Sequence, residues 1–281
     1  MRAIVLTAGL ATWPAAVSGQ VSPLDETVAR ISAYVEHYYG RAKAVVADET
    51  VTVRHFRRDM TSEGFPRRLV YELRVEWNPL AADDESRATI TRQLLEVNGR
   101  SARPDQEPEC LDPRGVSPEP LAFLLPGRLD EFTFAAAGTG RLNGQPVTMI
   151  DYRSVMPEPP EVEWNDTCAS IELPGRARGR IWADPETDEI VRLDEEIIGQ
   201  VDIPVPLTQR RFGGSRYLTI ERAHTSTRYR PVAFADPDET FMLPASIETM
   251  TVITNSGSPR VRTTQTFGNY RRFVTASRIV R

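Results

Sequence analysis

The feature that most constrains the fold of this sequence is a two-residue alternation of apolar and polar side chains. In residues 68–77, one set of alternate positions is apolar and the other set is mostly charged. The apolar set is Leu69, Tyr71, Leu73, Val75 and Trp77. Because successive side chains of a β-strand point to opposite faces, this pattern predicts a strand with one buried face.

The alternation recurs in nine further stretches, so most of the chain is predicted to be β. Turn-forming sequences separate several of them, including Asn98-Gly99, Asn143-Gly144 and the polar runs 184–188 and 255–259. Short turns of this kind join antiparallel strands. We therefore expect a mainly β (α+β) fold built on one large, curved antiparallel meander of sequential hairpins. The nine stretches are residues 50–56, 89–97, 131–137, 147–154, 179–183, 189–194, 217–229, 246–254 and 261–273.

A single amphipathic helix is predicted before the strands, over residues 23–40. Ser22 is placed to cap it, Pro23 suits the first helical position, and Gly40 is expected to end it. Its apolar residues recur at spacings of three and four, which gives one apolar stripe. The tyrosines at the end of this stripe are predicted to pack against the sheet, with a ligand contact as the alternative. The stripe and its tyrosines are Leu24, Val28, Ile31, Tyr34, Val35, Tyr38 and Tyr39.

Residues 1–19 have the order of regions found in a secretory signal peptide. Arg2 precedes an apolar stretch, and small residues close it. We expect cleavage near Gly19, export to the periplasm or the medium, and no lipid anchor, because no cysteine lies near the cleavage point. A buried N-terminal helix is the alternative. Residues 20–281 are predicted to form one domain, monomeric and not membrane-spanning, with Pro-rich insertions at about 100–128 and 155–178.

The two cysteines of the chain, Cys110 and Cys168, are predicted to form a disulfide, because export exposes them to an oxidising compartment. Two unpaired thiols are the alternative. No metal site is expected, because the three histidines (His37, His55 and His224) lack the spacing of zinc ligands.

Composition argues against a nucleic-acid partner. The 34 basic residues are outnumbered by 39 acidic ones, for a net charge of -5, and the arginines are interleaved with acids. No cofactor is expected, since phosphate-binding glycine loops are absent from the sequence. Enzymatic activity is not expected either: Ser215 does not lie in a GxSxG motif, and the carboxylates crowded into residues 184–196 are typical of a solvated hairpin. A carboxylate-dependent hydrolase is kept as the weaker alternative.

Three segments, residues 144–154, 179–196 and 263–273, resemble strands and a hairpin of the LolA and LolB type of lipoprotein carrier. The second contains a strand with Trp182, an Asp-Pro turn and a returning strand. The resemblance spans most of residues 22–281 and implies an open half-barrel with the helix on its concave side. It also implies a non-catalytic carrier of a lipid, a lipoprotein acyl chain or another hydrophobic ligand.

A half-barrel of this kind has an apolar concave face that a helix or a ligand must cover. The candidate ligand-binding residues on that face are Leu69, Tyr71, Leu73, Val75, Trp77, Phe132 and Phe134, with ordinary core packing as the alternative. A second possible function is an envelope sensor of similar fold whose concave face is plugged. Such a sensor would bind a partner protein or a surface of anionic headgroups. The arginines between residues 54 and 68 would suit this contact, namely Arg54, Arg57, Arg58, Arg67 and Arg68.

Overall fold

The computed structural model describes residues 22–42, 44–77, 88–103, 120–164, 168–210, 214–235, 238–256 and 259–272. Helix α1 (Pro23–Ala42) begins where the sequence predicts, and the Asp25 N–H donates to Ser22 Oγ at 3.1 Å. The helix ends two residues beyond Gly40. Its stripe is buried, with Ile31 and Val35 almost inaccessible to solvent. The amphipathic helix is therefore confirmed.

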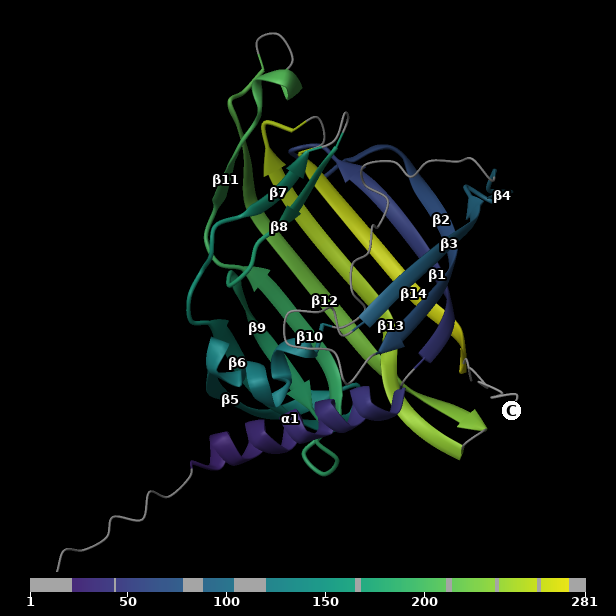
Figure 1. The fold of residues 1–281 in the computed structure, drawn as a ribbon, viewed down its shortest axis with the longest axis vertical. Helices are drawn as coiled ribbons and strands as arrows, with labels where there is room; N and C mark the ends of the chain where they lie inside the picture. Colours follow the sequence, from purple (N-terminus) through teal and green to yellow (C-terminus); the bar gives the residue numbers. More distant parts are fainter. Residues whose placement is uncertain are drawn as a thin grey trace, which may run out of the picture.

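The strands form one 12-stranded antiparallel sheet in the order β4-β3-β2-β1-β14-β13-β12-β10-β9-β6-β5, with β11 added beside β12. The two edges do not meet, so the sheet is an open half-barrel, and α1 lies across one end of it (Figure 1). The mainly β half-barrel predicted from the sequence is confirmed. Its strands are β1 (Ala44–Phe56), β2 (Ser62–Trp77), β3 (Ala88–Val97), β4 (Arg100–Ser101), β5 (Phe132–Leu142), β6 (Gln145–Ser154), β9 (Ala177–Ala183), β10 (Ile190–Ile197), β11 (Val201–Pro204), β12 (Tyr217–Ala235), β13 (Asp238–Thr254) and β14 (Arg260–Arg272).

Two hairpin turns have the backbone that their sequences predict. Asn98 and Gly99 have φ of 51° and 76°, and Asn143 and Gly144 have φ of 51° and 85°. Positive φ at both central residues is the requirement of a type I′ turn, which matches the twist of antiparallel strands.

The order of the strands departs from a sequential meander where the two ends of the chain meet in the sheet. The first strand pairs with the last, with Val51 opposite Gln265 and Val53 opposite Thr263. As a result β4 and β5, consecutive in the chain, lie at opposite edges of the sheet. Turn sequences fix hairpins between neighbours, but they carry no information about a pairing between the two ends of a chain.

The predicted insertions contain ordered structure. In the first, residues 104–119 lie outside the described residues, but η1 (Ala122–Leu124) and η2 (Pro126–Glu131) follow, and η1 packs into the core. In the second, β7 (Glu161–Trp164) and β8 (Ala169–Glu172) form a separate hairpin over Val201, Ile203 and Ile220. A third irregular stretch contains η3 (Leu207–Gln209). The first insertion is therefore not irregular throughout. The apolar residues of η1 are closely spaced among the prolines, and they pack into the core.

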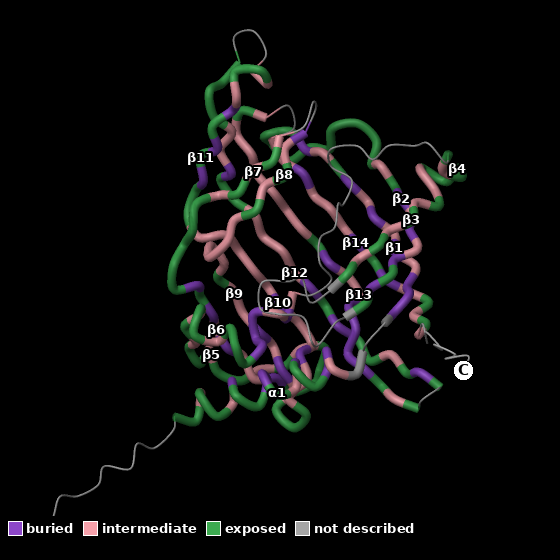
Figure 2. The backbone as a smooth tube through the Cα atoms, in the orientation of Figure 1, coloured by how far each residue is buried: buried purple, intermediate pink, exposed green. Residues whose placement is uncertain are grey.

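Buried side chains gather where α1 meets the concave face, and the opposite face of the sheet is largely exposed or half-buried (Figure 2). This main cluster joins α1 and η1 to eight strands of the sheet. A smaller cluster of Val51, Val53, Leu69, Tyr71 and Val261 lies further along β1, β2 and β14. Within the described ranges no helix is long and apolar enough to cross a membrane. The division into a signal peptide and a single domain stays a prediction, since residues 1–21 are outside those ranges.

Candidate functional site

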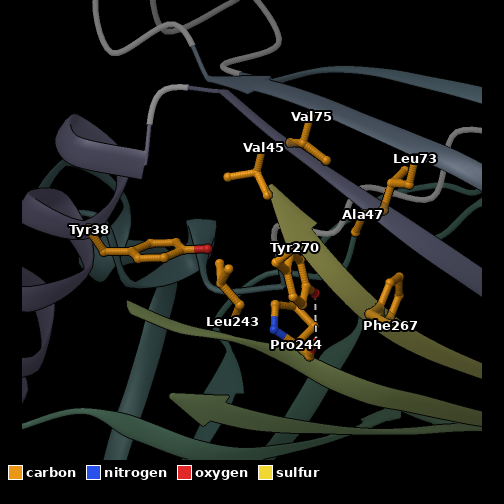
Figure 3. Close-up of a pocket in the computed structure, with 9 residues that line it drawn as sticks. All are labelled: Tyr38, Val45, Ala47, Leu73, Val75, Leu243, Pro244, Phe267 and Tyr270. Atoms are coloured by element: carbon orange, nitrogen blue, oxygen red, sulfur yellow. Dashed lines mark hydrogen bonds between the residues drawn. The ribbon is translucent and has the colours of Figure 1, made fainter. Parts of the chain in front are cut away.

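The candidate site is an apolar cavity between α1 and the concave face, shown in Figure 3. Tyr38 reaches into it from α1, and the other walls come from β1, β2, β13 and β14. The Tyr270 hydroxyl donates to the Pro244 carbonyl at 2.6 Å, so this polar atom is satisfied within the wall. The lining residues are Tyr38, Val45, Ala47, Leu73, Val75, Leu243, Pro244, Phe267 and Tyr270.

The cavity is small. Its volume of about 20 Å³ has room for one or two water molecules and is far too small for a lipid chain. Tyr38 closes it from the helix side and also contacts other rings, with centroids 5.1 Å from Tyr39 and 6.3 Å from Phe241. In this arrangement α1 plugs the concave face, and a larger ligand would enter only if α1 moved away.

The seven candidate ligand-binding residues do not share one pocket. Leu73 and Val75 line the cavity, whereas Leu69 and Tyr71 lie on the same face of β2 but in the smaller cluster beyond it. Trp77 ends β2, and its side chain is outside the described part of the structure. The other two belong elsewhere: Phe132 and Phe134 pack on the main core from β5, and Phe132 contacts Phe123 at 5.1 Å.

A buried ion pair beside the cavity was not found by sequence reasoning. Glu49 on β1 is 0% exposed, and its Oε2 accepts a hydrogen bond from Arg92 Nε at 2.7 Å. Glu49 follows the lining residue Ala47 by two positions and lies directly opposite the lining residue Phe267, so it is a neighbour of the cavity without lining it. The Arg92 side chain on β3 is only 8% exposed. The signal that could have found the pair is a charged residue at an apolar position in each strand.

A second carboxyl, that of the half-buried Glu195 on β10, lies on the concave face next to Tyr152. The Tyr152 hydroxyl donates to Glu195 Oε2 at 3.0 Å. Burial raises the pKa of Glu195 because desolvation penalises the charged form, and the hydrogen bond from Tyr152 lowers it by less. Its sequence neighbours point to the other face, where Asp194 pairs with Arg192 and Glu196 pairs with Arg178.

This alternation separates the carboxylates that crowd the 184–196 hairpin. In the turn, Asp184 Oδ1 accepts the backbone N–H groups of Glu186 and Thr187, and Asp188 pairs with Arg30 on α1. Asp184, Asp188, Asp194, Glu195 and Glu196 thus each have a structural partner, which weakens the hydrolase alternative. Among the residues that the structure describes, no group of three potential metal ligands is found.

Replacing Glu195 by Gln is expected to change how stability depends on pH. A carboxyl whose pKa is raised by folding holds a proton in the folded state that it has lost in the unfolded state. Stability therefore falls as pH rises above the ordinary Glu value of about 4.5 towards the raised value. The Glu195→Gln variant lacks this loss, so its free energy of unfolding should fall less than that of the wild type over this range.

The measurement is urea denaturation of both proteins between about pH 4 and pH 8. Glu196→Gln is a suitable control, because Glu196 is half-exposed and pairs with Arg178 on the other face. Parallel pH profiles for the wild type and Glu195→Gln would contradict the prediction.

The predicted disulfide would join Cys168, which the structure describes, to Cys110, which it does not. Cys168 is buried, and no free cysteine occurs in the described part of the chain. Cys110 lies outside the described residues, so the Cys110–Cys168 bond stays a prediction. We expect a thiol assay on the denatured protein to detect no thiol before reduction and two afterwards. Detection of two thiols in the unreduced protein would rule the bond out.

No family model and no curated protein matches this chain. Solved structures of low identity are similar to this chain over most of its length. A LolA superfamily protein from Nitrosomonas europaea has 6% identity and a TM-score of 0.33, covering 88% of this chain and 94% of that one. A DUF1329 family protein from Desulfovibrio piger has 8% identity and a TM-score of 0.39, with coverages of 92% and 96%. The Pseudomonas aeruginosa MucA/MucB complex has 11% identity and a TM-score of 0.21, with coverages of 89% and 99%. These similarities concern the fold alone.

Proposed function

We propose that the protein is an exported, non-catalytic binding protein that holds a hydrophobic ligand between α1 and the concave face. The apolar cavity at Tyr38 carries this proposal, because it lies at the contact between the helix and the sheet. The ligand is a lipid, a lipoprotein acyl chain or a molecule of similar polarity. Residues 1–19 provide the export signal in this proposal, and the periplasm or the medium is its location.

Uptake of a lipid chain requires α1 to exchange places with the ligand. The helix buries five large apolar side chains in the core: Val28, Ile31, Val35, Tyr38 and Tyr39. Exposing each costs about 2 kcal/mol, or about 10 kcal/mol together. A chain of about twelve methylenes recovers about 0.8 kcal/mol per methylene, or about 10 kcal/mol. The two terms nearly balance, as reversible loading and release require.

Binding is tested with a fluorescent fatty acid and by mass spectrometry of lipid that copurifies with the protein. Tyr38→Leu removes the ring that closes the cavity and should tighten probe binding about tenfold, the equivalent of about two further buried methylenes. Tyr39→Leu is the matched control, because Tyr39 is equally buried on α1 but does not line the cavity. The proposal fails if neither copurifying lipid nor probe binding is found, or if both variants behave alike.

The second candidate is an envelope interaction protein whose concave face stays plugged. The small size of the cavity favours it, since α1 already covers the apolar surface that a carrier would offer to a ligand. A protein that carries no lipid and does not bind the probe, in the wild type or as Tyr38→Leu, would support this function. It would then act through its outer surface.

A further inference from the structure

The face of the sheet opposite α1 carries an open groove across four strands, β6, β9, β10 and β12. Its volume is about 500 Å³, and charged side chains form most of its walls. Trp182 lies at one side and His224 at the other. These side chains alternate along their strands with the buried residues of the concave face, so the groove is separate from the cavity at Tyr38.

Arginines stand directly opposite each other at two places on this face. Arg153 on β6 is the cross-strand partner of Arg178 on β9, and Arg192 on β10 is the partner of Arg228 on β12. Like charges directly opposite each other on neighbouring strands are destabilising. The sheet therefore keeps an arrangement that costs stability, and an anion placed at either pair would relieve it.

One member of each opposed pair is neutralised within the sheet. Arg178 pairs with Glu196 at 3.1 Å, and Arg192 pairs with Asp194 at 2.7 Å. A further arginine of the groove, Arg180, binds Asp151 through two hydrogen bonds of 2.6 and 3.0 Å.

The other members of the two pairs, Arg153 and Arg228, are exposed and have no acidic partner in the described part of the chain. Arg153 lines the groove and Arg228 lies beside it on the same face, so this part of the sheet has two uncompensated positive charges on a protein whose net charge is -5. The Arg192 guanidinium also lies 4.7 Å from the centre of the Trp182 ring, which holds the floor of the groove in place.

The two unpaired arginines are separated by a distance that an extended peptide can span. Across the strands, they lie three strand spacings apart, or about 14 Å. His224 on β12 is in the same cross-strand row as Arg153. Arg228 lies four residues further along β12, which is about 13 Å in the strand direction. The diagonal is about 20 Å. An extended chain rises about 3.3 Å per residue, so about six residues join the two positions.

We propose that this groove and the strand face beside it bind an acidic, extended peptide segment of a partner protein, with carboxylates about six residues apart at Arg153 in the groove and at Arg228 beside it. The charge excess supplies the attraction, and the ordered ion pairs around Trp182 supply a rigid floor. This surface is independent of the concave face, so the protein can bind such a segment whether or not it carries a hydrophobic ligand.

The test uses a fluorescein-labelled 12-residue peptide of alternating Glu and Ser, with a Gln-Ser peptide of the same length as the neutral probe. Fluorescence anisotropy should show saturable binding of the acidic peptide that weakens as salt is raised. Arg153→Gln and Arg228→Gln should each weaken binding about two- to fivefold, and the double variant about tenfold. Both side chains are exposed, so an unchanged melting temperature will confirm that the variants fold.

Arg54→Gln is the matched control. Arg54 is also exposed and stands opposite another arginine, Arg262, but it lies on β1, outside the four strands of the groove. Equal binding of the two peptides, an unaltered affinity in the double variant, or an equal loss in Arg54→Gln would overturn the proposal. Binding to anionic phosphatidylglycerol vesicles, lost in the double variant while the peptide does not bind, would overturn it in favour of a lipid surface.

Discussion

Arg92→Met should lower the free energy of unfolding by about 3–5 kcal/mol, because it leaves the Glu49 carboxylate buried without its cation. Glu49 is 0% exposed, and its Oε1 has no hydrogen-bond partner among the described residues, so the bond from Arg92 to Oε2 is the main compensation for its charge. The pair lies between the main core and the smaller cluster around Leu69, where water cannot replace the lost guanidinium.

The double variant Glu49→Met/Arg92→Met distinguishes a net stabilising pair from a pair that is costly only when broken. Replacing both members of a buried pair by apolar residues of similar volume is often nearly neutral. We therefore expect the double variant to regain most of the stability that Arg92→Met loses, as measured by urea denaturation.

Arg180→Met is the control for loss of an ion pair as such. Its bond to Asp151 lies on the exposed face, where both side chains are at least 40% exposed, so its loss should cost less than about 1 kcal/mol. If Arg92→Met and Arg180→Met lower the free energy of unfolding equally, burial does not make the Glu49–Arg92 pair more costly to break than an exposed pair.

The hairpins could be predicted because their determinants are local. The Asn98-Gly99 and Asn143-Gly144 turns need residues that tolerate positive φ, and the alternation beside each turn assigns a face to every side chain. The pairing of β1 with β14 could not be predicted in this way. It joins residues more than 200 positions apart, and several strands offer edges with similar alternation.

The candidate site was only partly predictable for a related reason. A period of two gives the face on which a residue lies but not its position along the barrel. The alternation places Leu69 and Val75 on the same face of their strand, yet only Val75 lines the cavity, because α1 crosses one end of the sheet. The alternation of apolar residues does not reveal the Glu49–Arg92 pair, because a strand is recognised from its apolar positions. Glu49 also lies just before the predicted strand at residues 50–56.

Gly179→Ala is expected to destabilise the protein by about 3 kcal/mol, near the upper end for overpacking in a core. Gly179 lies on β9 between Tyr152 and Glu195, its cross-strand partners on the two sides. A Cβ atom at this position would overlap the Asp194 carbonyl oxygen and lie 2.8 Å from the Tyr152 ring. The backbone carbonyl belongs to a paired strand and cannot turn away, so the sheet itself must shift.

The shift should also disturb the bond from Tyr152 to Glu195, since the tyrosine ring lies against the glycine. Gly140→Ala on β5 is the matched control. Its Cβ would meet the flexible end of Met149, with Cε at 3.3 Å, so a rotamer change can absorb it and the cost should stay below about 1 kcal/mol. Urea denaturation of both variants measures the difference. Equal stabilities would mean that Tyr152 does not pack over Gly179, and that the half-buried position of Glu195 depends on other contacts.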